Sequence, residues 1–355
     1  MTTSIDPAKQ QQMQAIIGGA AAGALTAAMI SLGMRLGLYA ALDDGGAASS
    51  DELAARTGLH ERWLREWLYQ QASARILEHD GGRFSLPPEA RAYLSDERSL
   101  SYMGSSFLPL PHRIAAVDEL PESFRTGIGM SWDDRGAEAS QWTELLFRNW
   151  YEQVLVPGAL PLLEGAIARL EAGTRVADIG CGTGIALLTM ARAFPASSCH
   201  GYEISEHALG QARENARAGS ITNATFHNVR EEPLRGDHSF GLITTFDCLH
   251  DMTDPAGAAA AIRAAIAADG VWLIADINGQ PTFEENARTP LASTFYAMSV
   301  LSCMSSALSE PGGAGLGTLG LPEPAMRELT RAAGFTRFRR LDLKHPVNAF
   351  YEARP

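Results

Sequence analysis

The sequence predicts an α/β fold in its second half, where a mostly parallel sheet is covered by helices, behind a smaller helical module. Three observations favour this fold class. A short apolar run at 176–179 leads through alternating glycines into a helical pattern. From residue 174 onwards, strand-like and helix-like segments alternate, as they do in parallel sheets. Before residue 100, two helical patterns are followed directly by a hairpin pattern.

The first hundred residues, 1–100, are expected to form a separate helical domain. Their stretch at 16–42 is apolar and long enough to cross a bilayer, but it carries Arg35 and five glycines. We therefore expect one or two buried helices there rather than a membrane span. Small side chains allow helices to pack closely, which suits an intimate homodimer interface.

Residues 49–86 look like a winged helix, in which two helices are followed by a two-stranded wing. The first helix has Ser49 as an N-cap residue and ends at Gly58, and the second carries Trp63 and Trp67 at helical spacing. Winged helices often bind DNA, but five arginines here stand against six acidic residues, whereas a DNA-reading helix is basic. We expect a role in dimerisation and in covering the substrate, with both tryptophans used for packing.

The glycine-rich turn at 180–184 is the feature around which the second half is arranged. The dinucleotide fingerprint needs Gly or Ala where this chain has Ile185. The spacing Asp-x-Gly-x-Gly-x-Gly from residue 178 instead resembles the first motif of class I S-adenosylmethionine (SAM) dependent methyltransferases. This resemblance implies that Asp178 offers a carboxylate to the ammonium side of the cofactor. It also implies that the turn residues bind the cofactor: Gly180, Cys181, Gly182 and Gly184.

An acidic residue ends the next predicted strand. Glu203 lies nineteen residues after the turn, where it can accept hydrogen bonds from both ribose hydroxyls. After the third strand, the methyltransferases that this chain resembles often carry an acid that contacts the adenine amine, but this chain has Arg230. We expect Asn228, Glu231 or backbone groups beside Val229 to bind the adenine instead.

The predicted strands and helices after residue 174 suit a single sheet. Strands are expected at 174–179, 199–203, 224–229, 240–246 and 271–276, with helices at 208–218, 255–268 and 323–333. A final pair of strands is expected at 335–343 and 348–352. In the methyltransferase fold that the chain resembles, a Rossmann-like sheet of seven strands, this closing pair is antiparallel and the last strand is inserted into the sheet.

The fourth predicted strand ends in residues 246–252, at the edge where open α/β sheets bind ligands. We expect Phe246 and Asp247 to contact the cofactor, with Asp247 at its methionine end. His250, with Asp251 beside it, is the candidate catalytic base because imidazole titrates near neutral pH. The alternative role for His250 is capping or packing in a loop.

Two segments are expected to line the substrate pocket. They are the helical connector 101–170 and the insertion 278–321, which lies within the cofactor-binding domain 171–355. Long insertions are commonly functional or disordered, and the glycines at 312–317 suit a mobile lid. The candidate pocket residues are His112, Trp150, Asp276, Tyr296 and Met304.

Composition limits the classes of function. A net charge of −12 argues against nonspecific nucleic-acid binding, which depends on neutralising phosphates. The four cysteines include no Cys-x-x-Cys pair, and no His/Cys cluster has metal-ligand spacing, so we expect reduced thiols and no metal. The N-terminus lacks the basic flank of a signal peptide, so we expect a cytoplasmic protein.

Nearly the whole chain resembles bacterial SAM-dependent methyltransferases that carry an N-terminal winged-helix dimerisation domain. The resemblance depends on the winged helix, the glycine turn, residues 246–252, the glycines at 312–317 and the ending 345–352. The layout also resembles the small-molecule O-methyltransferases of plants and antibiotic pathways. The resemblance implies a homodimer that acts in secondary metabolism. It also implies that the enzyme methylates a small molecule at oxygen and releases S-adenosylhomocysteine (SAH). Methylation at nitrogen or carbon, a SAM-sensing winged-helix regulator, and a SAM enzyme without methyl transfer stay open as alternatives.

Overall fold

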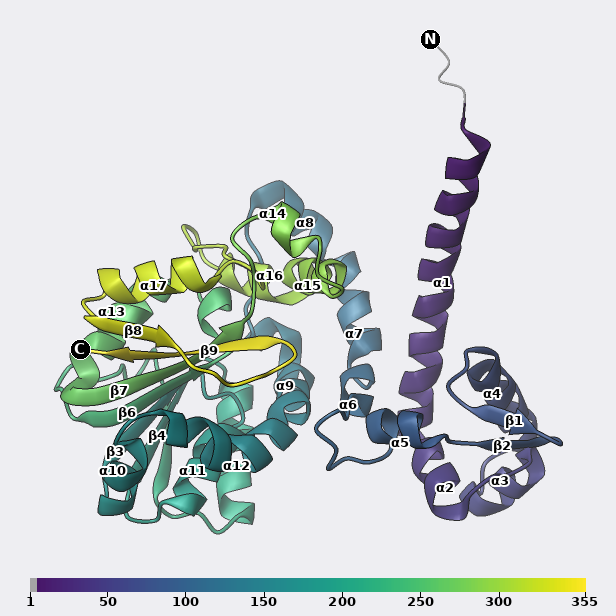
Figure 1. The fold of residues 1–355 in the computed structure, drawn as a ribbon, viewed down its shortest axis with the longest axis horizontal. Coiled ribbons are helices and arrows are strands. Elements are labelled where there is room, and N and C mark those ends of the chain that lie inside the picture. Colours follow the sequence, from purple (N-terminus) through teal and green to yellow (C-terminus); the bar gives the residue numbers. More distant parts are fainter. Residues whose placement is uncertain (1–4) are drawn as a thin grey trace. The chain divides into compact units, whose positions relative to one another are not determined.

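The chain divides into two compact units, Met1–Ala115 and Ala116–Pro355 (Figure 1). The computed structural model describes residues 5–355, apart from the side chains of residues 137–143. The boundary between the units falls within the predicted connector 101–170, so the first part of that connector belongs with the N-terminal helices.

The first unit is a helical domain with a small antiparallel hairpin. Its elements are α1 (Pro7–Arg35), α2 (Leu38–Gly45), α3 (Ser50–Thr57), α4 (Glu61–Ser73), β1 (Glu78–Asp80), β2 (Arg83–Ser85), α5 (Pro88–Leu94), α6 (Gly104–Phe107) and α7 (Leu110–Ala115). Ser49 and Glu52 cap α3 reciprocally, as in a capping box. Trp67 is buried and meets Tyr39 edge to face at 5.3 Å between ring centroids. Trp63 is 79% exposed, so its expected packing role is wrong within this chain.

Helix α1 is mostly exposed, and the expected burial of the stretch 16–42 is wrong for the first part of that stretch. Residues 5–25 are exposed throughout, including Ile17 at 63% and Leu25 at 70%. The rest of the unit packs against the end of α1, where Ile30 and Gly33 are buried. By length and composition, α1 also meets the criteria for a helix that could cross a membrane. An apolar surface of this size marks a site of interaction.

The second unit contains one sheet of seven strands in the order β5-β4-β3-β6-β7-β9-β8. The strands are β3 (Arg175–Ile179), β4 (Ser198–Glu203), β5 (Ala224–Asn228), β6 (Phe240–Phe246), β7 (Ile266–Ile277), β8 (Arg337–Arg340) and β9 (Asn348–Arg354). The first five pair in parallel, and β9 pairs antiparallel with both β7 and β8. The predicted fold is confirmed, including the antiparallel closing pair with the last strand inserted.

Helices cover both faces of this sheet (Figure 1). They are α9 (Gly136–Trp150), α10 (Ala166–Ala172), α11 (Ile185–Ala193), α12 (Glu206–Ala218), α13 (Pro255–Ala265) and α17 (Glu323–Ala332), while α8 (Leu120–Thr126) lies beside α14 in Figure 1. Residues of α10, α11 and a π-helical segment, Tyr151–Ala159, form one core against the sheet. Residues of α13 and α17 form the other. Because both faces are covered, every residue of β6 is buried, including Thr244 and Thr245, whose hydroxyls are hydrogen-bonded to Asp178 and Trp272.

The insertion 278–321 contains short helices as well as its glycine run. These are α14 (Phe283–Asn286), α15 (Ala292–Met298), a π-helical turn (Ser299–Cys303) and α16 (Met304–Ala307). The glycine run is anchored at Ala314, whose N–H donates to the carbonyl of Thr253 at 2.8 Å. This hydrogen bond ties the insertion to the loop that follows β6.

Candidate active site

The glycine turn lies at the carboxyl end of β3, where the chain passes into α11. Gly180, Gly182 and Gly184 have φ angles of 69°, 53° and 79°, which strain any residue with a side chain. A Cβ on Gly180 would lie 2.8 Å from Cys248, and one on Gly184 would lie 2.7 Å from Phe226. A Cβ on Gly182 would meet nothing within 4 Å. The turn is therefore closely packed at both ends and open at its middle, where a ligand can approach the backbone.

Glu203 ends β4 and turns its carboxylate towards the glycine turn. It accepts hydrogen bonds from the backbone N–H groups of Gly182 at 2.9 Å, Ile204 at 2.7 Å and Ser205 at 3.0 Å. Burial raises the pKa of Glu203, and these three donors oppose that rise. A carboxylate has about four lone-pair positions, so acceptor capacity remains for a ligand hydroxyl.

Asp178 and Cys181 lie buried beside the turn. Asp178 accepts a hydrogen bond from the hydroxyl of Thr244 at 2.6 Å, and burial raises its pKa to about 7. Burial also raises the pKa of the Cys181 thiol well above its usual range. An apolar setting of this kind favours a neutral thiol over a reactive thiolate.

The loop after β5 carries the predicted adenine contacts. The half-buried Asn228 donates its amide to Glu206 and accepts the N–H of Arg230 at 3.0 Å. The N–H of Val229 donates to the carbonyl of Glu203 at 3.0 Å. Arg230 forms an ion pair with Glu310 at 2.9 Å, so the arginine turns to the insertion.

The residues that end β6 lie between the cofactor strands and β9. Phe246 is buried, and its ring centroid lies 5.3 Å from that of Tyr151. Asp247 has a φ of 51°, and its carboxyl accepts the amide N–H of Asn348 on β9. Burial, then the charge of Asp276, raises the pKa of Asp247 to about 8. Its hydrogen bond directs this carboxyl towards β9 rather than towards β3.

His250 and Asp276 form a buried pair at the strand ends. The Nδ1 atom of His250 lies 2.6 Å from Oδ1 of Asp276, and the two side chains are 3% and 1% exposed. The same oxygen accepts the N–H of Ile277 at 2.8 Å, which fixes the carboxylate. Burial acts to lower the pKa of His250, but the charges and hydrogen bonds of Asp276 and Cys303 together outweigh it and raise that pKa well above its usual value. With Nδ1 occupied by Asp276, Nε2 is the nitrogen through which the imidazole can exchange a proton, in competition with Cys303, which also hydrogen-bonds His250.

Asp251 follows His250 in the same turn and is also buried. Its carboxyl accepts the indole N–H of Trp132 at 3.1 Å, and burial raises its pKa to about 7. Potential metal-ligating atoms of His250, Asp251 and Cys303 lie within 4.8 Å of one another. Cys303 also hydrogen-bonds His250, which accounts for its position without an ion.

Residues 129–135, within the connector predicted to line the pocket, contact this site through side chains that were not among the candidate site residues. Trp132 in this segment donates to Asp251, as described above. Its neighbour Asp133 accepts a hydrogen bond from the hydroxyl of Ser205 at 2.6 Å, and Ser205 lies next to Glu203. The guanidinium of Arg135 donates to the carbonyls of Leu301 and Ser302 in the insertion, at 2.6 and 3.2 Å. The segment therefore links three loops at the carboxyl edge of the sheet. We refer to residues 129–135 as the strap.

Trp150 is the centre of an aromatic group. Its ring stacks on Phe350 of β9 at 5.0 Å between centroids and meets His345 edge to face at 5.9 Å. Phe246 also lies against it, at 6.3 Å. The predicted pocket residue Trp150 is thus brought next to the predicted cofactor residue Phe246.

Three further residues were predicted to line the pocket: Met304, Tyr296 and His112. Met304 is half-buried and begins α16, which packs against the turn Leu249–Asp251 that carries His250. Tyr296 is 36% exposed and its ring lies against Phe283 at 5.9 Å. His112 lies on α7 in the first unit and is exposed there. Its role, and those of the other site residues, stay predictions.

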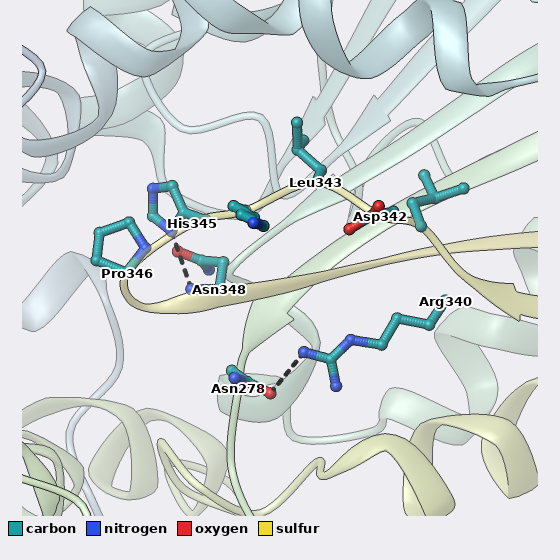
Figure 2. Close-up of a pocket in the computed structure, with 9 residues that line it drawn as sticks. Asn278, Arg340, Asp342, Leu343, His345, Pro346 and Asn348 are labelled. Carbon is teal, nitrogen blue, oxygen red and sulfur yellow. Dashed lines mark hydrogen bonds between the residues drawn. The ribbon is translucent and has the colours of Figure 1, made fainter.

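The loop that joins β8 to β9 lines a cavity of about 490 Å³ (Figure 2). Its lining includes Asn278, Arg340, Lys344, His345 and Asn348. The imidazole of His345 accepts the backbone N–H of Asn348 at 2.9 Å, and Arg340 donates to Asn278 at 3.1 Å (Figure 2). Because Asn348 also bonds Asp247, the cavity borders the buried acidic residues.

Comparisons with known proteins agree with this geometry. Residues 170–310 match the family model of a methyltransferase domain, and residues 24–96 match that of an Rv2258c-like winged HTH domain. A ubiquinone biosynthesis O-methyltransferase from Neisseria meningitidis serogroup A is 32% identical over 111 residues, which are 31% of this chain and 46% of that protein. The chain thus spans about half the length of this relative.

Solved structures show the same fold over the whole chain. A mitomycin 7-O-methyltransferase has a TM-score of 0.68 at 19% identity, over 99% of this chain and 100% of that one. Human N-acetylserotonin methyltransferase, solved in complex with SAM, has a TM-score of 0.69 at 16% identity, over 100% of this chain and 99% of that one. This chain therefore contains a winged HTH domain followed by a methyltransferase domain, in the fold of the class I SAM-dependent methyltransferases.

Proposed function

We propose that this chain transfers a methyl group from SAM to a hydroxyl oxygen of a small molecule and releases SAH. The observation that carries the proposal is the buried His250–Asp276 pair, which lies on the same strand-end edge as the glycine turn. A base held by a buried carboxylate suits the removal of a proton from an alcohol or a phenol.

The residues along β3, β4 and β6 fit SAM. The open backbone at Gly182 leaves room for the amino-acid part, and the remaining acceptor capacity of Glu203 suits a ribose hydroxyl. When bound, SAM supplies a methyl group on a cationic sulfur, and that carbon–sulfur bond breaks as the acceptor's oxygen–carbon bond forms. The residues proposed to hold it are Asp178, Gly180, Cys181, Gly182, Gly184, Glu203, Asn228, Val229, Phe246 and Asp247.

His250 is the proposed base. The hydroxyl proton of the acceptor passes to Nε2, because Nδ1 is held by Asp276. The imidazolium that forms is stabilised by the adjacent carboxylate, and its proton is returned to solvent after product release. Asp251, fixed by Trp132, adds a second carboxyl next to this imidazole and is proposed to help orient the acceptor.

The Neisseria relative supports oxygen as the methylated atom. Its name describes an O-methyltransferase, and its matched region covers 31% of this chain. For this chain we therefore favour a hydroxyl acceptor. Its pocket is proposed to include His112, Trp150, Asp276, Tyr296 and Met304, contributed by the connector 101–170, the strand β7 and the insertion 278–321.

We further propose that the protein is a cytoplasmic homodimer formed through its N-terminal domain, 1–100. The exposed part of α1 contains Gly18, Gly19 and Gly23, and a Cβ on any of them would meet nothing within 4 Å. A glycine inside a helix costs about 1 kcal/mol relative to alanine, so close approach of a second helix gives these residues a purpose. The four cysteines are free thiols, which suits a reducing compartment.

Turnover with SAM tests the proposed reaction. Purified protein is incubated with methyl-labelled SAM and a panel of alcohols, phenols, amines and carbon acids of similar size. We expect SAH to accumulate with a labelled methyl ether from at least one hydroxyl compound. Label on nitrogen or carbon, or product formation without SAH, would contradict the proposal.

A further inference from the structure

Two buried acceptor atoms lack a hydrogen-bond partner at the acceptor side of the site. Among the described residues, Oδ2 of Asp276 and Oδ1 of Asn348 accept no hydrogen bond, although the two residues are 1% and 4% exposed. A buried polar atom without a partner costs about 1–3 kcal/mol. These two oxygens are therefore positioned to receive donors from a bound molecule.

The order of strands separates these atoms from Asp178 and Glu203, while Asp247 on β6 lies between the two groups and bonds Asn348. Asp178 lies on β3 and Glu203 on β4, whereas Asp276 lies on β7 and Asn348 on β9. In the order β4-β3-β6-β7-β9, the unpartnered oxygens are two and three strands away from Asp178. Neighbouring strands are about 4.8 Å apart, so this distance is about 10–14 Å. The free acceptors thus face the position of the methyl acceptor, not that of the ribose.

The titratable groups named around these oxygens are carboxyl groups, with His250 as their cationic partner, and burial already raises the pKa values of Asp247 and Asp251 to about 8 and about 7. Asp247 and Asp251 accompany Asp276, and within the described residues the cationic side chain that pairs with this group is His250. A carboxylate placed among three buried carboxyl groups would have no cation to compensate it, which is costly in a low-dielectric site.

The neighbouring cavity does not supply that cation. Arg340 lines it, but its guanidinium already contacts Asn278 at 3.1 Å and Glu323 at 3.5 Å. Lys344 lines it as well and is exposed to solvent. Asn348 is the residue through which the cavity reaches the acidic group.

We infer that the methyl acceptor carries a second donor group, a hydroxyl or a protonated amine, which donates to Asp276 Oδ2 and Asn348 Oδ1, and that a carboxylate at this position is excluded. The inference rests on the proposed function, because it assigns the substrate class of the same site. An ammonium group satisfies both oxygens and offsets the acidic charge, whereas a hydroxyl satisfies one of them.

Three matched phenols test this inference on protein saturated with SAH. They are 4-(2-aminoethyl)phenol, 4-(2-hydroxyethyl)phenol and 3-(4-hydroxyphenyl)propionate, and their binding is measured by titration calorimetry. We expect the amine and the alcohol to bind at least about tenfold more tightly than the carboxylate, because each can donate to at least one of the two oxygens without adding negative charge.

Two variants separate this site from the cavity rim. Asp276→Asn keeps the shape and removes the charge, so the discrimination against the carboxylate should shrink by about tenfold. Arg340→Gln changes a rim residue, and the order of the three probes should stay the same.

The outcomes distinguish the inference from the proposed function. Failure of SAH itself to bind the folded protein would overturn the proposed function. If SAH binds, the inference is overturned by equal binding of the three probes, by preference for the carboxylate, or by binding of none of them. Probe binding that needs added Mg²⁺ or Zn²⁺ and is lost with a chelator would also overturn it, because the acids would then hold a metal.

Discussion

A buried imidazole takes up a proton readily when a nearby charge stabilises the resulting cation, and Asp276 provides that charge for His250. Replacing His250 with Gln should lower kcat by about 10²–10⁴-fold, the range for loss of a general base. The affinity for SAH should stay unchanged, because His250 lies on the acceptor side. Steady-state kinetics and calorimetry measure the two quantities, with His207→Gln on the exposed face of α12 as the control. A His250 variant with the full kcat would remove this residue from the reaction.

The pH dependence of kcat tests the pairing with Asp276. The charge of Asp276 raises the pKa of His250, and the base works only in its neutral form, so the rate should rise with pH as His250 loses its proton. In Asp276→Asn the charge of Asp276 is lost while burial, the largest influence and one that lowers that pKa, remains beside the smaller contribution of Cys303, so the rising limb should move to lower pH. The maximal rate should also fall, because the imidazolium is less stabilised. An unmoved limb in this variant would show that another group controls the profile.

Glu203 is the residue whose removal should affect SAH affinity most directly. Glu203→Ala removes the acceptor for the ribose and leaves three backbone N–H groups without their partner, so SAH binding should weaken by about 1–3 kcal/mol. Glu214→Gln, an exposed change on α12, serves as the matched control and should bind normally. Equal affinities of the two variants would reject the ribose role.

At the scale of residues, the sequence predicts those site residues whose position follows from the strand pattern directly before them. The glycine turn, Glu203 and His250 follow directly after strand patterns, so their place at the sheet edge can be read from spacing. Trp132 and Asn348 could not be found in this way, because each reaches the site through contacts 119 and 101 residues away in the chain. Asp276 was expected in the pocket, but its pairing with His250 depends on the order of strands in the sheet.

At the scale of elements, the strap holds the loops after β4 and β6 and the insertion 278–321 together through hydrogen bonds. Its Gly129 donates to the carbonyl of Leu308 at 2.9 Å, and an added Cβ would lie 1.9 Å from the carbonyl oxygen of Ser305. Gly129→Ala should therefore displace the strap and destabilise the protein by about 1–3 kcal/mol, as overpacking does. Hydrogen exchange should increase in residues 299–308, measured by mass spectrometry.

A second glycine provides the control for this change. Gly210 lies inside α12, where an added Cβ would meet nothing within 4 Å. Gly210→Ala should therefore stabilise the protein by about 0.5–1 kcal/mol, opposite in sign to Gly129→Ala. Similar stabilities for both variants would argue against close docking of the strap.

Element prediction succeeded where periodicity was strong and failed where burial depended on other parts of the molecule. The strands and helices of the sheet domain and the winged helix lie close to where their patterns place them, but the predicted helix 255–268 ends at Ala265 and β7 begins at Ile266. The apolar pattern of α1 predicts burial, but its first residues are exposed in this chain, since hydrophobicity alone does not say what covers a helix. The short helices of the insertion lack a clear period, because they pack along several directions.

For the whole molecule, the exposed α1 leads to a prediction about assembly. Sedimentation velocity at micromolar concentration should show a dimer of the 38.0 kDa chain. Gly19→Leu should shift it towards monomer, because a bulky side chain prevents close approach of a second helix. Gly81→Ala, in the hairpin turn of the same unit, serves as a control and should leave the dimer intact. A monomeric wild-type protein would contradict the proposed assembly.

The most direct test of the central claim, a SAM-dependent methyltransferase, is titration calorimetry of the folded wild-type protein with SAH. We predict saturable binding at one site per chain, weakened in Glu203→Ala and retained in His250→Gln. Absence of binding to a protein that is folded by circular dichroism, or binding that Glu203→Ala leaves intact, would contradict the account of this site.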